Sequence, residues 1–313
     1  MAYAAGDLIL HDHYNVFATG NADGSANNAV ANINTVWGTG TGALGYGQTA
    51  TTITGVTAGA VITATQWSTL IGRLNSVLTH QAGTGSGITL PTAGATVAYV
   101  ASLQTGVTTA FNNKANYATQ GATVTGTNYD YTITSTTGLT NYTTNLTVSF
   151  ASGDAARYFF NAGGQLNVRL STVNSADSGA ESSFARLVTG LGGVAFRNTA
   201  NGGRTGSGIT LNTNNTALGY RTNILNTPQT IVQVTDTTSS YTASTGYLQV
   251  YTNTDHSENG SVGATVVFRT VYSIADKTWD DSMSLTYRMA IDIVYPETSN
   301  LPASPWGTPS IGG

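Results

Sequence analysis

Hydrophobic and polar positions follow two different periods along the chain, and the change comes near Tyr117. Before this point the strongest pattern covers Thr63–Gln81, where apolar residues recur at spacings of three and four. These residues are Trp67, Leu70, Ile71, Leu74, Val77 and Leu78. Thr63 followed by Gln66 fits a capping box, so the segment is predicted to form a helix with one apolar stripe.

Further helices are expected in the same part of the chain. Thr96–Asn112 has helical spacing, and the turn Gly87–Gly94 would join it to the first helix as an antiparallel partner. Asp12 can cap a short helix over His13–Thr19. Asn27–Val36 is another stretch with helical spacing.

After Tyr117 the period is two, and β-branched and aromatic residues alternate with Thr, Ser and Asn. The segments with this pattern are 123–134, 145–151, 165–173, 230–235, 247–252, 263–273 and 283–295. Turn residues separate them. Alternation over this many segments predicts an antiparallel β-sandwich with half-buried sheets.

The expected fold is therefore α+β and mainly β. Residues 1–115 are predicted to form a small helical or mixed docking and oligomerisation region, and residues 116–297 the antiparallel β-sandwich. Residues 298–313 are rich in Pro and Gly and are expected to form an arm that lies on a neighbour or is loose.

Charged residues are scarce, most of all at the start of the chain. Only 8% of the 313 residues are charged, while Thr and Asn number 55 and 26, and a typical soluble domain has roughly 25% charged residues. Residues 1–115 hold five charges. Because burying a hydroxyl costs far less than burying Lys or Glu, this pattern favours a first third enclosed by partners. A free-standing low-charge domain is the alternative.

Composition also excludes some kinds of site and some classes of partner. Cys is absent, which removes disulfides, thiolate metal sites and cysteine nucleophiles. A formal net charge of -4 offers no basic stripe for phosphates, so nucleic acid is not an expected partner. The first ten residues lack a basic region and their apolar run is short, so neither Sec export nor a membrane partner is expected.

Two patterns in the first third suggest a dinucleotide site and a metal site, and each lacks residues that such a site needs. Gly40–Gly45 matches the GxGxxG spacing of a dinucleotide site, but the next acidic residue is Asp130, so a glycine turn is expected instead. His11, Asp12 and His13 offer two imidazoles without a third ligand nearby. Neither pattern predicts a cofactor or a metal.

Four carboxylates beside Trp279 form the strongest acidic group: Asp276, Asp280, Asp281 and Asp292. Paired acids would suit glycoside hydrolysis, and clustered acids a calcium ion. The calcium-loop pattern is missing, and the run is typical of a turn between two long strands. No nucleophile elbow, phosphate loop or zincin helix is present either, so we expect no catalytic residue and no enzyme.

The 16 Tyr residues suit a core, subunit contacts or a ligand surface. Core or subunit contact is expected for Tyr129, Tyr131, Tyr158, Tyr272 and Tyr287. A surface that contacts carbohydrate is the alternative for residues in or near the polar loop 252–260, namely Tyr241, Tyr247, Tyr251 and His256.

The heptapeptide TGSGITL occurs twice, at Thr84–Leu90 and at Thr205–Leu211. The residues that follow the two copies differ, so a solenoid repeat is not indicated. The pair marks either two equivalent loop-to-strand segments or a coincidence in a chain rich in Thr and Gly.

The segment Phe150–Leu170, FASGDAARYFFNAGGQLNVRL, resembles a motif of virion structural proteins of tailed bacteriophages, particularly marine and cyanobacterial phages. In those proteins an ARYFFN-x-GG core precedes a strand of a β-rich domain. GYGQ at Gly45–Gln48, and ITATQWSTL at Ile62–Leu70 before a helix ending in THQAG, are similar to other elements of the same proteins. The resemblance covers most of residues 1–200, and its motifs are structural.

Around that core, the residues Arg157–Asn161 are expected to enter a strand, with Phe159 and Phe160 on opposite sides. Gly163 and Gly164 would then make a hairpin turn with positive φ. Asn161 could bond to the turn backbone.

The resemblance implies a virion structural protein but says little about its position in the particle. Together with the low charge, it leads to the hypothesis of a non-enzymatic component of the tail, neck or baseplate periphery, such as a fibre or collar. It would assemble in the host cytoplasm from identical subunits and other virion proteins. The apolar stripe is the expected assembly interface, with Trp67, Leu70, Ile71, Leu74 and Leu78. Two alternatives are a host-attachment adhesin or tail fibre that recognises surface carbohydrate, and a capsid decoration protein.

Overall fold

A computed structural model of the chain describes residues 11–92, 100–135, 141–174, 179–222, 227–237, 246–255, 263–273 and 283–313. The chain divides into two compact units, each built from several stretches of sequence. The helical unit comprises residues 1–122, 157–163 and 296–307, and the sheet unit comprises the remainder. Compared with the boundaries expected from sequence, the helical unit takes two short segments from the second half of the chain.

The helical unit contains α1 (His11–Ala18), α2 (Ile33–Trp37), η1 (Thr49–Thr51), α3 (Ala64–Ala82) and α4 (Val100–Asn112). Helix α3 begins as predicted, because the side chains of Thr63 and Gln66 each accept a hydrogen bond from the other's backbone N–H. Gly83 ends it in the left-handed conformation. Helix α2 is shorter than expected and starts at Asn32, whose side chain accepts a bond from the Thr35 N–H.

The pairing of α3 with α4 was predicted wrongly. Gln81 at the end of α3 donates a 2.9 Å hydrogen bond to the Ala110 carbonyl near the end of α4, and Leu74 packs closely on Gly106. The two helices therefore run parallel. The described start of the connection, residues 84–92, returns along α3, where Ser68 donates to the Pro91 carbonyl. A tight turn would have been needed for the antiparallel arrangement.

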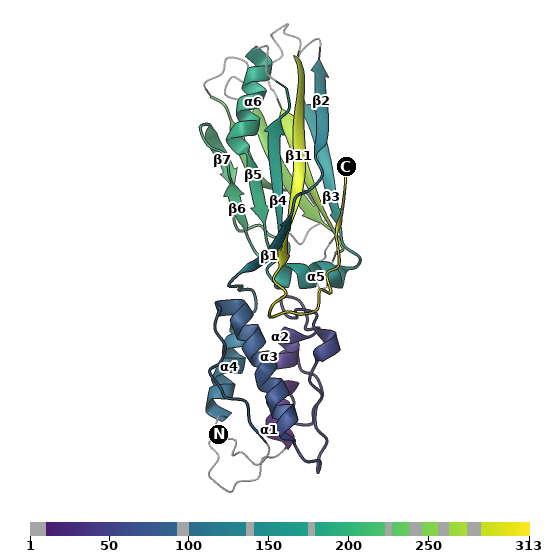
Figure 1. The fold of residues 1–313 in the computed structure, drawn as a ribbon. Helices are drawn as coiled ribbons and strands as arrows, with labels where there is room; N and C mark the ends of the chain where they lie inside the picture. Colours follow the sequence, from purple (N-terminus) through teal and green to yellow (C-terminus); the bar gives the residue numbers. More distant parts are fainter. Residues whose placement is uncertain are drawn as a thin grey trace. The chain divides into compact units, whose positions relative to one another are not determined.

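The described strands form two six-stranded sheets (Figure 1). The first has the order β1-β11-β4-β5-β6, with β2 also beside β11. Its strands are β1 (Gln120–Val124), β2 (Tyr129–Ser135), β4 (Gln165–Thr172), β5 (Gly193–Phe196), β6 (Asn201–Arg204) and β11 (Met283–Pro296).

The second sheet has the order β12-β3-β10-β9-β8-β7. Its strands are β3 (Asn141–Ser149), β7 (Thr210–Asn214), β8 (Gln229–Thr235), β9 (Tyr247–Thr254), β10 (Thr265–Ser273) and β12 (Ser310–Gly312). The two sheets are antiparallel, so the predicted α+β, mainly β fold with antiparallel sheets is confirmed.

The core of the sheet unit lies between the two sheets. Phe196 of β5 and Phe268 of β10 meet edge to face, with ring centroids 5.3 Å apart. Helix α6 (Gly179–Leu191) adds Phe184, whose ring contacts Tyr272 and Tyr287. Both tyrosines are 2% exposed, which confirms the core position expected for them.

One edge of this sandwich is closed by tyrosine hydroxyls. Tyr129 of β2 donates a 2.7 Å hydrogen bond to the Ile311 carbonyl of β12, and Tyr131 donates to the Asn145 carbonyl of β3. These bonds join a strand of the first sheet to two strands of the second. The half-buried tyrosines thus satisfy backbone groups that a sheet edge would otherwise leave open.

The strand predicted over the ARYFFN core is wrong, because Gly153–Asn161 forms helix α5. The Ser152 hydroxyl accepts a 3.1 Å bond from the Ala155 N–H, and this cap is a helix signal that the aromatic run conceals. Phe159 and Phe160 are both buried, with ring centroids 5.1 Å apart, instead of facing opposite sides. Gly163 has the expected positive φ, but it links a helix to β4 and not two strands of a hairpin.

The C-terminal residues 298–313 pack on their own chain. Leu301 and Trp306 are buried within the helical unit, and Ser310–Gly312 pairs with β3. The expectation of an arm that is loose or lies on a neighbour is therefore corrected. Two apolar anchors in a Pro-rich run are enough to hold it.

Candidate functional site

The motifs that carry the phage resemblance meet inside the helical unit. Asn161 and Arg157, four residues apart on α5, point toward the glycine turn at Gly40–Gly45. The Asn161 amide donates to the carbonyls of Gly42, Leu44 and Gly45 at 3.1–3.3 Å, and Arg157 donates to the Leu44 carbonyl at 2.5 Å. Asn161 was expected to bond to the turn at Gly163 and Gly164, but its amide bonds instead to a turn more than 110 residues away in sequence.

The next motif residue, Gly47, is required for this packing. A Cβ on Gly47 would lie 2.6 Å from the ring of Tyr158 and 2.5 Å from Pro305. Its backbone also has a φ of 70°, which side chains rarely adopt. Any other residue at this position would separate the glycine turn from α5.

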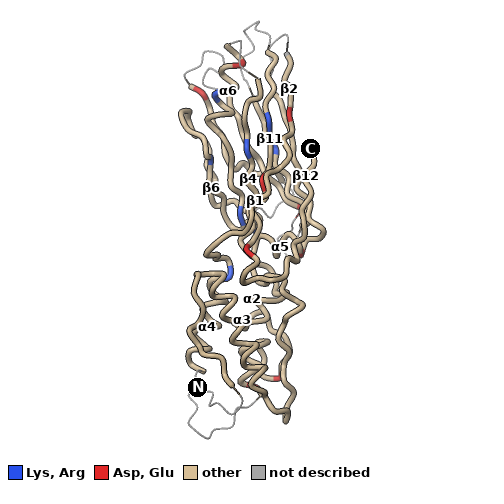
Figure 2. Tube along the Cα trace, viewed as in Figure 1, with Lys and Arg blue, Asp and Glu red and all other residues tan. Residues whose placement is uncertain are grey.

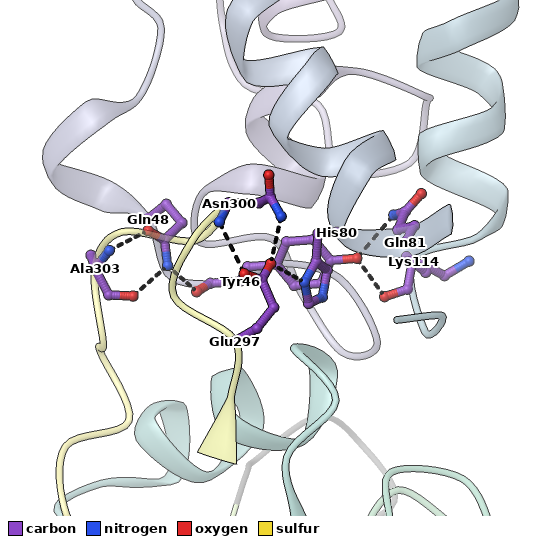
Figure 3. A network of polar contacts seen from close by, with 8 residues as sticks. All are labelled: Tyr46, Gln48, His80, Gln81, Lys114, Glu297, Asn300 and Ala303. Carbon is purple, nitrogen blue, oxygen red and sulfur yellow. Dashed lines mark hydrogen bonds and ion pairs between the residues drawn. The ribbon is translucent and has the colours of Figure 1, made fainter. Parts of the chain in front are cut away.

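A buried polar network extends from the same turn to the segment after β11 (Figure 3). Tyr46 donates to the Lys114 carbonyl at 3.0 Å and accepts a bond from Gln81 at 2.9 Å. Gln48 and the backbone of Ala303 exchange two hydrogen bonds of 2.8 Å. The side chains of the GYGQ motif thus fix residues from both ends of the sequence.

His80 and Glu297 form the centre of the network. The His80 Nδ1 lies 2.9 Å from the Glu297 Oε1, and the residues are 1% and 6% exposed. The Glu297 carboxylate also accepts bonds from the backbone and side-chain N–H groups of Asn300. Within the described residues the His80 Nε2 has no hydrogen-bond partner, which fits a neutral imidazole that donates from Nδ1.

The protonation of this pair follows from its surroundings. Burial lowers the pKa of His80, and the hydrogen bond and charge of Glu297 offset only part of that effect. Burial raises the pKa of Glu297, but the bonds from Asn300 and His80 outweigh it and hold the pKa below its usual value. Burial also raises the pKa of the Tyr46 phenol. The network is therefore a neutral imidazole on a carboxylate.

The network suits structure better than catalysis. Its acid and imidazole are buried, and it contains no serine or threonine side chain that could act as a nucleophile. The network holds residues 296–307 against α3 and against the glycine turn. Breaking these hydrogen bonds would leave buried polar groups without partners, which costs free energy. It is a candidate site for stability and not for turnover.

The predicted assembly stripe lies in the core of the helical unit. Trp67 is 2% exposed, Leu78 is 8% exposed, and Leu70, Ile71 and Leu74 are fully buried. The Trp67 ring meets Tyr14 edge to face at 5.3 Å. The assignment of these residues to an interface is therefore corrected, because α3 already buries this face within its own chain.

The predicted carbohydrate-contacting residues are only partly described. Tyr241 and His256 lie outside the described residues. Tyr247 and Tyr251 lie on the same face of β9 and are half-buried. The loop expected from residue 252 begins later, because Thr252 and Thr254 are buried residues of β9.

The acidic and histidine groups do not form a site in the described part of the chain. Asp276, Asp280 and Asp281 lie outside it, and Asp292 of β11 pairs with Arg169. His11, Asp12 and His13 lie in the first turn of α1. No group of three His, Asp or Glu residues in the described ranges could hold a metal ion.

A pocket of about 270 Å³ lies between α1 and α4. It is lined by His13, Val16, Phe17, Val100, Ala101 and Gln104. These side chains include one titratable group and no carboxylate, so they offer no acid–base pair. The helices described here include none that is long and apolar enough to cross a membrane.

Comparison with known proteins finds no matching family model, no matching curated protein and no matching solved structure.

The anchoring role of Asn161 can be tested directly. Asn161→Asp replaces a donor with a carboxylate that faces three carbonyl oxygens, so we expect a loss of about 1–3 kcal/mol in the free energy of unfolding. Backbone amides that close the turn, such as Tyr46 and Gln48, should exchange hydrogen faster. Asn116→Asp, the same change at an exposed position, is the control. Equal effects of the two variants would contradict the anchoring role.

Proposed function

We propose that this chain is a non-enzymatic structural component of a bacteriophage virion, built as a homo-oligomer in the tail, neck or baseplate periphery. The helical unit docks on the particle and on identical copies. The sheet unit forms a collar or fibre element. Two observations on the described part of the chain support this role. One is the distribution of charge, and the other is that the side chains of the ARYFFN and GYGQ motifs are used in contacts within the helical unit.

The charge distribution carries the proposal. The helical unit holds seven charged residues: Asp7, Asp12, Asp23, Arg73, Lys114, Arg157 and Glu297. Arg157 and Glu297 are buried in the contacts described above. Figure 2 shows most charges on the sheet unit, while α1, α2, α3 and α4 carry few. A surface this poor in charge favours association over free solution.

Even the remaining cations are partly covered. The Arg73 guanidinium lies 5.0 Å from the Trp37 ring centroid, and the Lys114 ammonium lies 5.1 Å from that of Phe111. The surface of the helical unit therefore presents mainly Thr, Asn, Ala and Gly. Such a surface can be buried against another chain without stripping water from ionised groups.

The test is to find the protein in the particle. Purified virions probed with an antibody against the sheet unit, and imaged by electron microscopy, are expected to show label at a fixed position with regular spacing. Mass spectrometry of the same particles gives the copy number. Particles that lack the protein after repeated purification, while infected cells contain it, would overturn the proposal.

A host-attachment role is the second candidate, and the outer face of β9 favours it. Tyr251 lies opposite Arg269, which in turn lies opposite Asn145 and donates to it at 2.9 Å. A half-buried aromatic ring beside a guanidinium and an amide is a combination that stacks on and hydrogen-bonds sugar rings.

Tyr251→Ala is expected to lower adsorption of virions to host cells by about tenfold if this face binds carbohydrate. Adsorption rates measured with Asn253→Ala, a neighbouring half-buried position on the same face, provide the control. Normal adsorption of the Tyr251→Ala virions would exclude this face as the receptor site.

A further inference from the structure

Strand β7 is an edge with little protection. It ends the second sheet and, among the described strands, pairs with β8 alone. Four of its five residues are exposed and the fifth is half-buried, so neither face is covered. Residues 205–220 contain no charged residue and no Pro. Soluble proteins usually protect edges with charges, Pro or bulges, and β7 has only a register shift after Leu211.

Three of the other edge strands, β6, β2 and β12, are better protected. In β6, Arg204 supplies a charge and donates to the carbonyls of Gly190 and Ile209. In β2, Asp130 forms an ion pair with Arg288, and in β12 the Ile311 carbonyl accepts the Tyr129 hydroxyl. Strand β1 is, like β7, an edge without a charge or Pro, and of these two β7 is the one whose heptapeptide occurs elsewhere in the chain.

The sequence of β7 has a twin in the helical unit. Thr84–Leu90 repeats the heptapeptide of Thr205–Leu211, and the second glycine of each copy has a left-handed φ, 71° for Gly87 and 84° for Gly208. Gly87 and Gly208 therefore share the left-handed conformation directly before each ITL segment. After the turn, Thr210 and Leu211 pair with β8, whereas Ile88–Leu90 lies outside both sheets.

The Ile88–Leu90 segment has the properties of an unpaired strand. Leu90 is 50% exposed. Ser86 and Ile88 donate their N–H groups to the side chains of Asn75 and Ser86, which holds the turn. The backbone N–H groups of Thr89 and Leu90 have no partner in the described part of the chain.

We propose that Ile88–Leu90 of one copy adds as a strand to the free edge of β7 in a second copy. Thr210 and Leu211, the last two residues of the second copy, already lie in a strand where β8 offers an edge, so their counterparts Thr89 and Leu90 can pair where β7 offers one. Neither segment contains a charged residue, so pairing them places no like charges opposite each other. The inference deepens the proposed assembly role and rests on it for the choice of a second copy as partner.

This contact joins two different surfaces, so repeated pairing builds a ring or a filament. It also gives the helical unit an association mode that does not use the buried stripe of α3. Residues 84–90 act as the donor and β7 as the acceptor.

Two matched variants test the contact on the purified full chain. Leu90→Lys and Leu211→Lys each place a charge at the last residue of one heptapeptide. Sedimentation velocity over a concentration series is expected to show reversible association of the wild type, and a dissociation constant raised about tenfold or more in either variant. The controls Val61→Lys and Val173→Lys replace exposed valines outside both segments and should associate as the wild type does.

A mixing experiment distinguishes the proposed contact from association through other surfaces. Each variant retains one intact surface, so an equimolar mixture of Leu90→Lys and Leu211→Lys should form heterodimers that neither forms alone. A monomeric wild type, unchanged association in both variants, or sensitivity to Leu211→Lys alone would overturn the inference. If labelled virions contain the protein and both variants enter them normally, the inference fails while the virion role stands.

Discussion

Replacing Trp67 with alanine is expected to lower the free energy of unfolding of the helical unit by about 3–5 kcal/mol. The side chain is 2% exposed and meets Tyr14 in the core, so its loss leaves a cavity among the helices. Denaturant unfolding followed by circular dichroism at a fixed, low protein concentration measures the effect. At such a concentration a loss of association alone would not change the transition.

Val61→Ala is the control, because Val61 is 84% exposed in the same unit. Its transition should match that of the wild type. If Trp67→Ala instead left the transition unchanged and altered only association, the placement of the α3 stripe in the core would be wrong. Those results would restore its interpretation as an assembly surface.

The existence of α3 could be predicted because its signals are local. The capping box lies within four residues, and the apolar period repeats along one segment. What covers the stripe could not be predicted, because its partners lie on α1, α2 and α4. Low charge does not separate burial inside a chain from burial between chains, and so the stripe was assigned to an interface.

The network of His80 and Glu297 was missed for the same reason. The two residues are 217 positions apart, and nothing in the sequence around either one marks the other. The contact of α5 with the glycine turn had a weak signal. Arg157 and Asn161 are the polar residues at helical spacing in an otherwise apolar run, which indicates one polar side of a helix more than the two faces of a strand.

Acidification is expected to destabilise the helical unit in two steps. His80 has a pKa lowered by burial, so the unfolded chain takes up a proton at a higher pH than the folded chain does. Stability therefore falls as the pH drops below the ordinary histidine value of about 6.5. Glu297 has a pKa held down by Asn300 and His80, so its contribution is lost at still lower pH, as the folded carboxylate becomes protonated.

Hydrogen exchange of the α3 amides, measured between pH 7.5 and about pH 2.5 and corrected for intrinsic exchange, reports on this unit alone. His80→Asn keeps a donor for Glu297 but cannot titrate, so it should flatten the upper part of the profile, where one group contributes at most about 1.4 kcal/mol per pH unit. Glu297→Gln should remove the lower step and, because it leaves His80 without its anionic acceptor, weaken α3 at pH 7.5 as well. His13→Asn removes a partly exposed imidazole of α1 and serves as the control. A His80→Asn profile identical to that of the wild type would show that this buried imidazole does not set the acid sensitivity of the fold.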